Sequence, residues 1–108
     1  MQTGLIIELT YKASHHVSRL DHPVHSHSHF HTWTVQLKVA GFTDAHNIQQ
    51  WMHETAPHFA DHGDKGVEDI AAWWVELAQK RFDEGPEGLR VLGVSLMRED
   101  GIGAFVDA

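Results

Sequence analysis

The stretch from His25 to Gly41 constrains the fold more than any other part of the chain, because it joins a clear strand pattern to a run of histidines. From Thr32 to Val39, polar residues alternate with β-branched, aromatic or aliphatic ones, and this period of two predicts a half-buried strand with an apolar odd-numbered face. His29 and His31 share that face, about 6.6 Å apart at ~3.3 Å per residue. Two imidazoles therefore flank one point at its end.

The first predicted strand ends in a histidine in the same way. Its odd positions from Leu5 to Ala13 are apolar or aromatic, and His15 is the next residue of that parity. If the two strands pair as neighbours, three imidazoles meet at one end of a shared face. Three neutral imidazoles with an open position form the ligand set of a catalytic zinc, so we predict Zn²⁺ held by His15, His29 and His31.

Two simpler interpretations compete with this one. A single histidine at the end of an apolar strand face is commonly a hydrogen-bonded rim residue. The alternating run from His25 to His31 is also compatible with an exposed, adventitious metal-binding tract of the low-complexity kind. The shared parity of three histidines on two strands favours a built site.

Composition limits the class of protein. A chain of 108 residues predicts one domain spanning 1–108, small enough that self-association would help to cover its apolar surface. The net charge of -7 and the lack of a Lys/Arg cluster argue against nucleic acid and anionic membranes as partners. The absence of cysteine leaves His and carboxylates as the metal ligands. With no long apolar run and no leader at the start, we expect a cytoplasmic protein.

Hydrophobic periodicity and turn residues predict six elements, with a Gly-rich loop over 61–66 and Pro57 kinking or shortening the first helix. The elements are strands over 4–14 and 27–40, helices over 45–60 and 67–82, and strands over 89–98 and 104–106. The order strand, strand, helix, helix, strand, strand predicts an α+β two-layer sandwich: a four-stranded antiparallel sheet with both helices on one face.

With these positions placed, the chain resembles the 6-pyruvoyltetrahydropterin synthase and 6-carboxytetrahydropterin synthase family, whose fold is the T-fold. Six motifs carry the resemblance, in the family's order and over nearly the whole chain. They are Lys12-Ala13-Ser14-His15, His29-Phe30-His31-Thr32-Trp33 with Gly41, Asp44-Ala45-His46-Asn47-Ile48, Asp61-His62, Glu68 in a helix start, and Met97-Arg98-Glu99-Asp100.

The resemblance implies a function and roles for the matching residues. It implies a zinc-dependent lyase acting on a dihydroneopterin triphosphate-type reduced pterin, in a homo-oligomer whose active sites lie at subunit interfaces. Zinc would bind the substrate's side-chain oxygens beside a base that moves protons. His62 with Asp61 would supply that base, since imidazole titrates near neutral pH, and Glu99 would hold the amino and ring N–H groups of the pterin.

The chain also departs from the family. His25 stands where these enzymes have a catalytic Cys, so it is either a substitute base or a fourth ligand that closes the metal site. The missing Cys keeps open a pterin- or purine-binding metalloprotein without the reaction. A His-rich metal-buffering protein is a further alternative. A cupin also uses His-x-His, but Gln36 stands near the place of its Glu ligand and two helices do not suit an all-β barrel.

Overall fold

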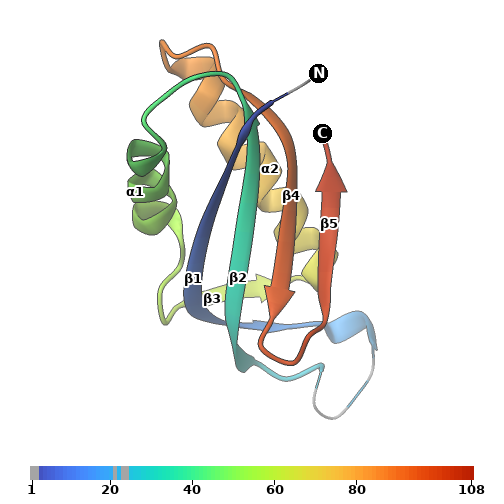
Figure 1. Ribbon diagram of the computed structural model, residues 1–108. Coiled ribbons are helices and arrows are strands. Elements are labelled where there is room, and N and C mark those ends of the chain that lie inside the picture. The colour runs from blue at the N-terminus through green and yellow to red at the C-terminus, as the bar shows by residue number, and fades with distance from the viewer. Residues whose placement is uncertain (1–2, 21, 23–24) are drawn as a thin grey trace.

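The structure, a computed structural model, describes residues 3–20, 22 and 25–108, and these form an α+β fold. Within that part of the chain, one mixed sheet has the strand order β3-β1-β2-β4-β5, and two helices accompany it (Figure 1). The elements are β1 (Leu5–His16), η1 (Ser18–Leu20), β2 (His29–Ala40), α1 (Ala45–Thr55), β3 (Asp61–Asp64), α2 (Val67–Glu84), β4 (Arg90–Arg98) and β5 (Gly103–Asp107).

The long antiparallel pair β1 and β2 is the framework of the molecule. Its register runs from Leu5 opposite Val39 to His15 opposite His29. Side chains alternate between the two faces of a strand, so the odd residues of both strands lie on the same side. That side is buried, with Tyr11 opposite Trp33 in its centre. The predicted pairing of the two strands and the predicted core face are confirmed.

Both helices pack on this buried face. Ile48 and Met52 of α1, and Ile70 and Trp74 of α2, belong to the same core cluster as Trp33. Figure 1 shows α2 lying along the sheet behind β2, β4 and β5, and α1 beside β1. The predicted α+β class with helices on one face is therefore confirmed. In these described residues no helix is long and apolar enough to cross a membrane.

The prediction of four antiparallel strands is wrong, because residues 61–64 form a fifth strand, β3, parallel to β1. Two Gly and the absence of apolar residues had indicated a loop over 61–66. The free edge of β1 supplies hydrogen-bond partners that the local sequence does not reveal, beginning with Ser14 N–H to Ala60 C=O at 2.9 Å. Pairing with a distant strand thus outweighs local turn preference.

The first helix is shorter than predicted. It ends at Thr55 and not at 60, because Pro57 disfavours helical geometry at the residue before it. Ala56 is accordingly extended and closes the helix with its N–H bonded to Met52 C=O. The other predicted boundaries differ from the observed ones by one or two residues.

Candidate metal centre

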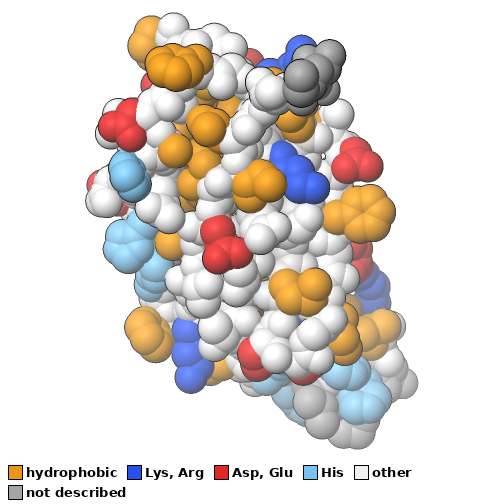
Figure 2. All heavy atoms as spheres, in the orientation of Figure 1, with side chains coloured by type: hydrophobic (Ala, Val, Ile, Leu, Met, Phe, Trp, Pro, Cys, Tyr) orange, Lys and Arg blue, Asp and Glu red, His pale blue; other side chains and the backbone are white. Residues whose placement is uncertain are grey.

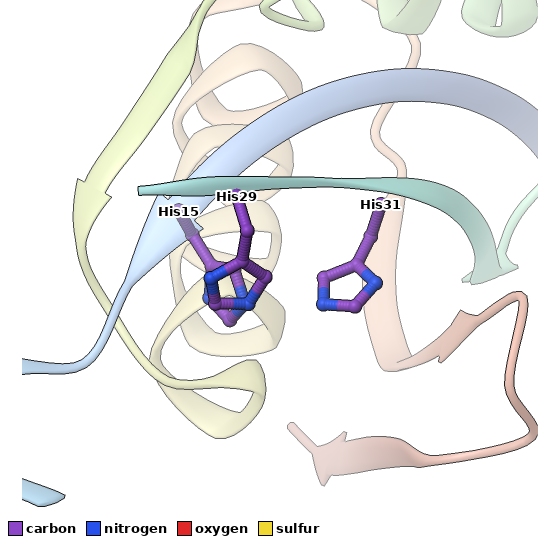
Figure 3. Close-up of side chains that lie close together, drawn as sticks. All are labelled: His15, His29 and His31. Atoms are coloured by element: carbon purple, nitrogen blue, oxygen red, sulfur yellow. The ribbon is translucent and has the colours of Figure 1, made fainter. Parts of the chain in front are cut away.

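Three histidines meet at the end of the β1–β2 pair: His15, His29 and His31, called the histidine triad below. His15 lies directly opposite His29, and His31 is two residues further along β2 on the same face. Figure 3 shows the three rings projecting to the same side of the two strands. Each residue offers one nitrogen, and the three nitrogens lie within 4.8 Å of one another. The convergence predicted from parity is confirmed.

Backbone carbonyls fix the tautomers of two triad members. His15 Nδ1 lies 2.8 Å from the carbonyl oxygen of Lys65, and His29 Nδ1 lies 2.8 Å from that of His27. A carbonyl can only accept, so each Nδ1 carries the proton and donates it. In the neutral form of each ring the lone pair is then on Nε2, which is the state a metal ligand needs.

The third member is oriented by a carboxylate. His31 Nδ1 lies 3.0 Å from both carboxylate oxygens of Glu99, which follows the end of β4. A carboxylate bound to the outer nitrogen of a ligating histidine holds the ring and raises its basicity. The Glu99 side chain remains about half exposed. The family resemblance implies that Glu99 binds the pterin ring. In the structure its carboxylate lies against His31.

Two triad nitrogens have no hydrogen-bond partner although they are buried. These are Nε2 of His15 and Nε2 of His31. An unpaired buried polar atom costs about 1–3 kcal/mol, so such atoms need an explanation. Burial also lowers the pKa of His15, which keeps it neutral and able to donate a lone pair. The residues present therefore fit a metal ion, and the triad could hold one.

A pocket of about 300 Å³ opens beside His15, between η1, the start of α2 and the end of β4. We call it the triad pocket; its polar lining includes His25, Arg19, Glu68 and Arg98. Arg19 pairs with Glu68, and Arg98 pairs with Asp100. Sequence reasoning did not single out the two arginines, although basic residues are scarce in this acidic chain. Of the triad, His15 alone lines this pocket.

His62 lies in the core and not against the triad. Its ring is 5.9 Å from Trp33, which in turn is 5.0 Å from His15. Its Nε2 is 2.7 Å from the hydroxyl oxygen of Tyr11. Burial, with a smaller contribution from the positive charge of Lys65, lowers the pKa of His62 to about 4. Trp33 thus contacts both His62 and His15, and His62 is not a member of the converging group.

The other two candidate catalytic residues lie nearer the surface. Asp61 accepts hydrogen bonds from the Gly63 backbone, which lowers its pKa, and from the Ser14 hydroxyl at 2.9 Å. The ring of His25 is 6.3 Å from that of His29 and lies on the wall of the triad pocket. Among the described residues, the converging group contains the triad alone, so His25 is a neighbour of the site and not a member.

Fold and site together define an α+β protein with a three-histidine candidate metal centre. No protein-family profile and no curated protein matches the chain. Among solved structures, it is similar to the crystal structure of an uncharacterized protein from Wolinella succinogenes. The two have a TM-score of 0.75 and 15% identity, over 99% of this chain and 98% of the other. The likeness extends to the fold alone.

Proposed function

We propose that this protein is a zinc-dependent lyase of the 6-pyruvoyltetrahydropterin synthase and 6-carboxytetrahydropterin synthase type, acting on a dihydroneopterin triphosphate-type reduced pterin. The observation that carries the proposal is the pair of buried, unpartnered Nε2 atoms of His15 and His31, beside His29. Three neutral imidazoles with their outer nitrogens bonded elsewhere are typical of a catalytic zinc site. Zinc bound there would supply a Lewis acid that polarises a substrate oxygen.

The T-fold assignment is part of the same proposal. The two long N-terminal strands, the two helices on one face and the two C-terminal strands support it, as do the six motifs in order. The additional strand β3 carries the Asp61-His62 motif along the edge of β1. The motifs that contain His15, His29 and Glu99 therefore lie at one end of the sheet, whereas Gly41 and the Asp44 motif follow the other end of β2.

The surroundings of the metal centre favour His25 over His62 as the base. His25 lies on the wall of the triad pocket, where a substrate bound to the metal would meet it. His62 is bonded to Tyr11 inside the core, and burial lowers its pKa to about 4; desolvation lowers the pKa of His25 as well, by a smaller amount. A base should titrate near the working pH and reach the reacting atom. Glu99 would meet the pterin ring through the exposed part of its carboxylate.

The test is turnover of 7,8-dihydroneopterin triphosphate by the zinc-loaded full chain, followed by chromatography. We expect product with zinc, none after removal of the metal, and none from His15→Ala. His16→Ala is the matched control, because it removes the adjacent histidine, which points away from the triad, and should retain turnover. Substrate binding with no product over hours would contradict the lyase.

A second candidate function is a pterin- or purine-binding metalloprotein that retains the metal and has lost the reaction. The replacement of the family's Cys by His25 and the engagement of His62 with Tyr11 favour it. In that case calorimetry should detect pterin binding that depends on zinc, while turnover stays at the level of the metal-free protein.

A third candidate is a His-rich metal buffer. Figure 2 shows histidine side chains gathered at the lower end of the molecule, where Figure 1 places the segment between η1 and β2. The rings of His22 and His25 are 4.3 Å apart in that segment. Stoichiometry separates the candidates: one tight zinc lost in His15→Ala fits the triad, whereas several weak zincs unaffected by that change fit a buffer.

We also propose that the protein is a homo-oligomer. The face of the sheet turned away from the helices carries exposed hydrophobic side chains on four strands: Ile6 on β1, Phe30 on β2, Met97 on β4 and Phe105 on β5. The edge of β5 has free backbone groups, which natural proteins usually cover. Sedimentation at micromolar concentration should give a mass above that of one chain, and a strictly monomeric protein would contradict this part of the proposal.

A further inference from the structure

Three side chains form a hydrogen-bonded chain in the core, next to the metal centre but outside it. Tyr11 of β1 and His62 of β3 are almost fully buried, and Trp74 of α2 is buried against them. Trp74 Nε1 lies 3.1 Å from the Tyr11 hydroxyl oxygen, and that oxygen lies 2.7 Å from His62 Nε2. Tyr11 is therefore the central member.

The chemistry of the three groups fixes the direction of both hydrogen bonds. An indole N–H can only donate, so the Tyr11 oxygen accepts from Trp74. The phenol has one proton, and among the described residues its only other hydrogen-bond partner is His62 Nε2. The phenol therefore donates to Nε2, which must be unprotonated. The proton of the neutral imidazole is then on Nδ1.

The opposite arrangement is less stable. If His62 Nε2–H donated to the Tyr11 oxygen, the phenol proton would have no acceptor in this part of the core, and a buried unpaired group costs about 1–3 kcal/mol. Burial raises the pKa of Tyr11, so the phenol keeps its proton at neutral pH. Both considerations favour the arrangement in which the Tyr11 hydroxyl donates to Nε2 and the imidazole proton is on Nδ1.

We propose that Tyr11 is a positioning residue for His62. Its hydroxyl group donates a hydrogen bond to Nε2, which holds the ring in the Nδ1–H tautomer and makes Nε2 unavailable for proton transfer. The tautomer follows from the hydrogen bonds alone. Its consequence for catalysis rests on the proposed function: the base of that reaction is not His62 Nε2. The Asp61-His62 motif is thus present in the sequence, while the nitrogen that would accept a proton is engaged inside the core.

The experiment is long-range ¹H–¹⁵N NMR of the metal-free full chain at pH 7, which distinguishes protonated from unprotonated imidazole nitrogens. The His62 signals are assigned by their loss in His62→Gln. We expect Nε2 to be unprotonated and Nδ1 protonated. A protonated Nε2 overturns the proposal. Because no metal and no pterin are present, failure here is distinct from failure of the lyase proposal.

Two variants separate the effect of the phenol from that of the core. Tyr11→Phe removes the hydroxyl, and we expect the Nε2–H form, which is preferred by free histidine, to become the major or an equal population. An unchanged tautomer in Tyr11→Phe overturns the proposal. Trp74→Phe is the matched control, because it removes the donor to Tyr11 and leaves the Tyr11–His62 bond, so the wild-type tautomer should persist. The wild-type spectrum alone tests the assignment if Tyr11→Phe fails to fold.

Discussion

The histidine triad and His62 lie on the same face of the sheet, and they differ in the hydrogen bonds that their ring nitrogens make. In the histidine triad, Nδ1 of each ring is bonded to the protein, and Nε2 of His15 and of His31 is left without a partner. In His62, Nε2 is bonded to Tyr11, which is bonded to Trp74. The Trp33 ring contacts both regions, with its centroid 5.0 Å from that of His15 and 5.9 Å from that of His62.

The difference shows that burial alone does not identify a functional histidine. His62 and His15 are both buried and both have a lowered pKa. The protein satisfies the buried Nε2 of one and leaves that of the other unpaired at a place where a second and a third nitrogen converge. An unpaired buried acceptor needs a physical explanation, and an ion bound there would provide one. The following predictions test that contrast, from the largest expected effect to the smallest.

Removal of a triad ligand should have the largest effect. We expect His15→Ala to weaken zinc binding by more than the roughly 100-fold that loss of an outer-shell partner causes. Competition with a chromophoric chelator measures the affinity. In wild type, zinc at about 100 times its Kd should stabilise the fold by about 2.7 kcal/mol, and this stabilisation should vanish in the variant. Equal zinc affinity in both proteins would show that the triad is not the site.

The lowered pKa of His62 should make stability depend on pH. The folded pKa is about 4 and the ordinary value is 6.5, so the unfolded state binds more protons between these limits. Stability is then full above pH 6.5 and is lost as the pH falls toward 4. The loss is on the order of 3 kcal/mol at 1.36 kcal/mol per pKa unit.

Urea unfolding of the metal-free chain between pH 4 and 7 measures this effect. His62→Gln should reduce the slope of the curve and leave the part that the lowered pKa of His15 contributes, whereas the control His46→Gln, which removes an exposed histidine, should retain the full slope. If the stability of His62→Gln depends on pH as strongly as that of the wild type, His62 is not the source of the dependence.

Removal of the carboxylate that orients His31 should have an intermediate effect. Loss of an outer-shell partner typically lowers metal affinity by about 10–100-fold, so we expect a decrease in that range for Glu99→Gln. Asp100→Asn is the matched control, since its carboxylate pairs with Arg98 and not with a triad member. A decrease as large for Asp100→Asn as for Glu99→Gln would point to a general electrostatic effect.

The smallest effect is expected at His25. It lies on the pocket wall outside the converging group, so His25→Ala should change zinc affinity by less than the roughly 10-fold of an outer-shell partner. Competition with the chromophoric chelator measures this change in zinc affinity. A loss as large as that of His15→Ala would make His25 a fourth ligand and would close the open position that the proposed reaction needs.

Much of the fold follows from local patterns in the sequence. The alternation in β1 and β2 predicted the core face and, provided that the two strands pair, the convergence of His15, His29 and His31, because strand parity carries information over many residues. Elements that form only by pairing with a distant segment could not be predicted from local patterns. Residues 61–64 become a strand only because the edge of β1 is free beside them.

The details of the site depend even more on such distant contacts. Nothing near His62 in the sequence indicates that Tyr11, 51 residues earlier, binds its Nε2. Likewise, Glu99 and His31 are 68 residues apart and meet because β4 pairs with β2. Sequence reasoning thus found the residues of the site, but the hydrogen-bond partners that determine their chemistry come from tertiary structure.

The bond from His15 to the carbonyl of Lys65 connects the histidine triad to the start of a helix. Lys65 directly precedes Gly66, the N-cap residue of α2, and the Lys65 N–H donates to His16 C=O. A cation that fixes the His15 ring therefore also restrains the peptide group at the entrance to the longest helix. Amide hydrogen exchange in the first turn of α2 should slow when zinc is added. The backbone amides of this turn would then report whether the histidine triad is occupied.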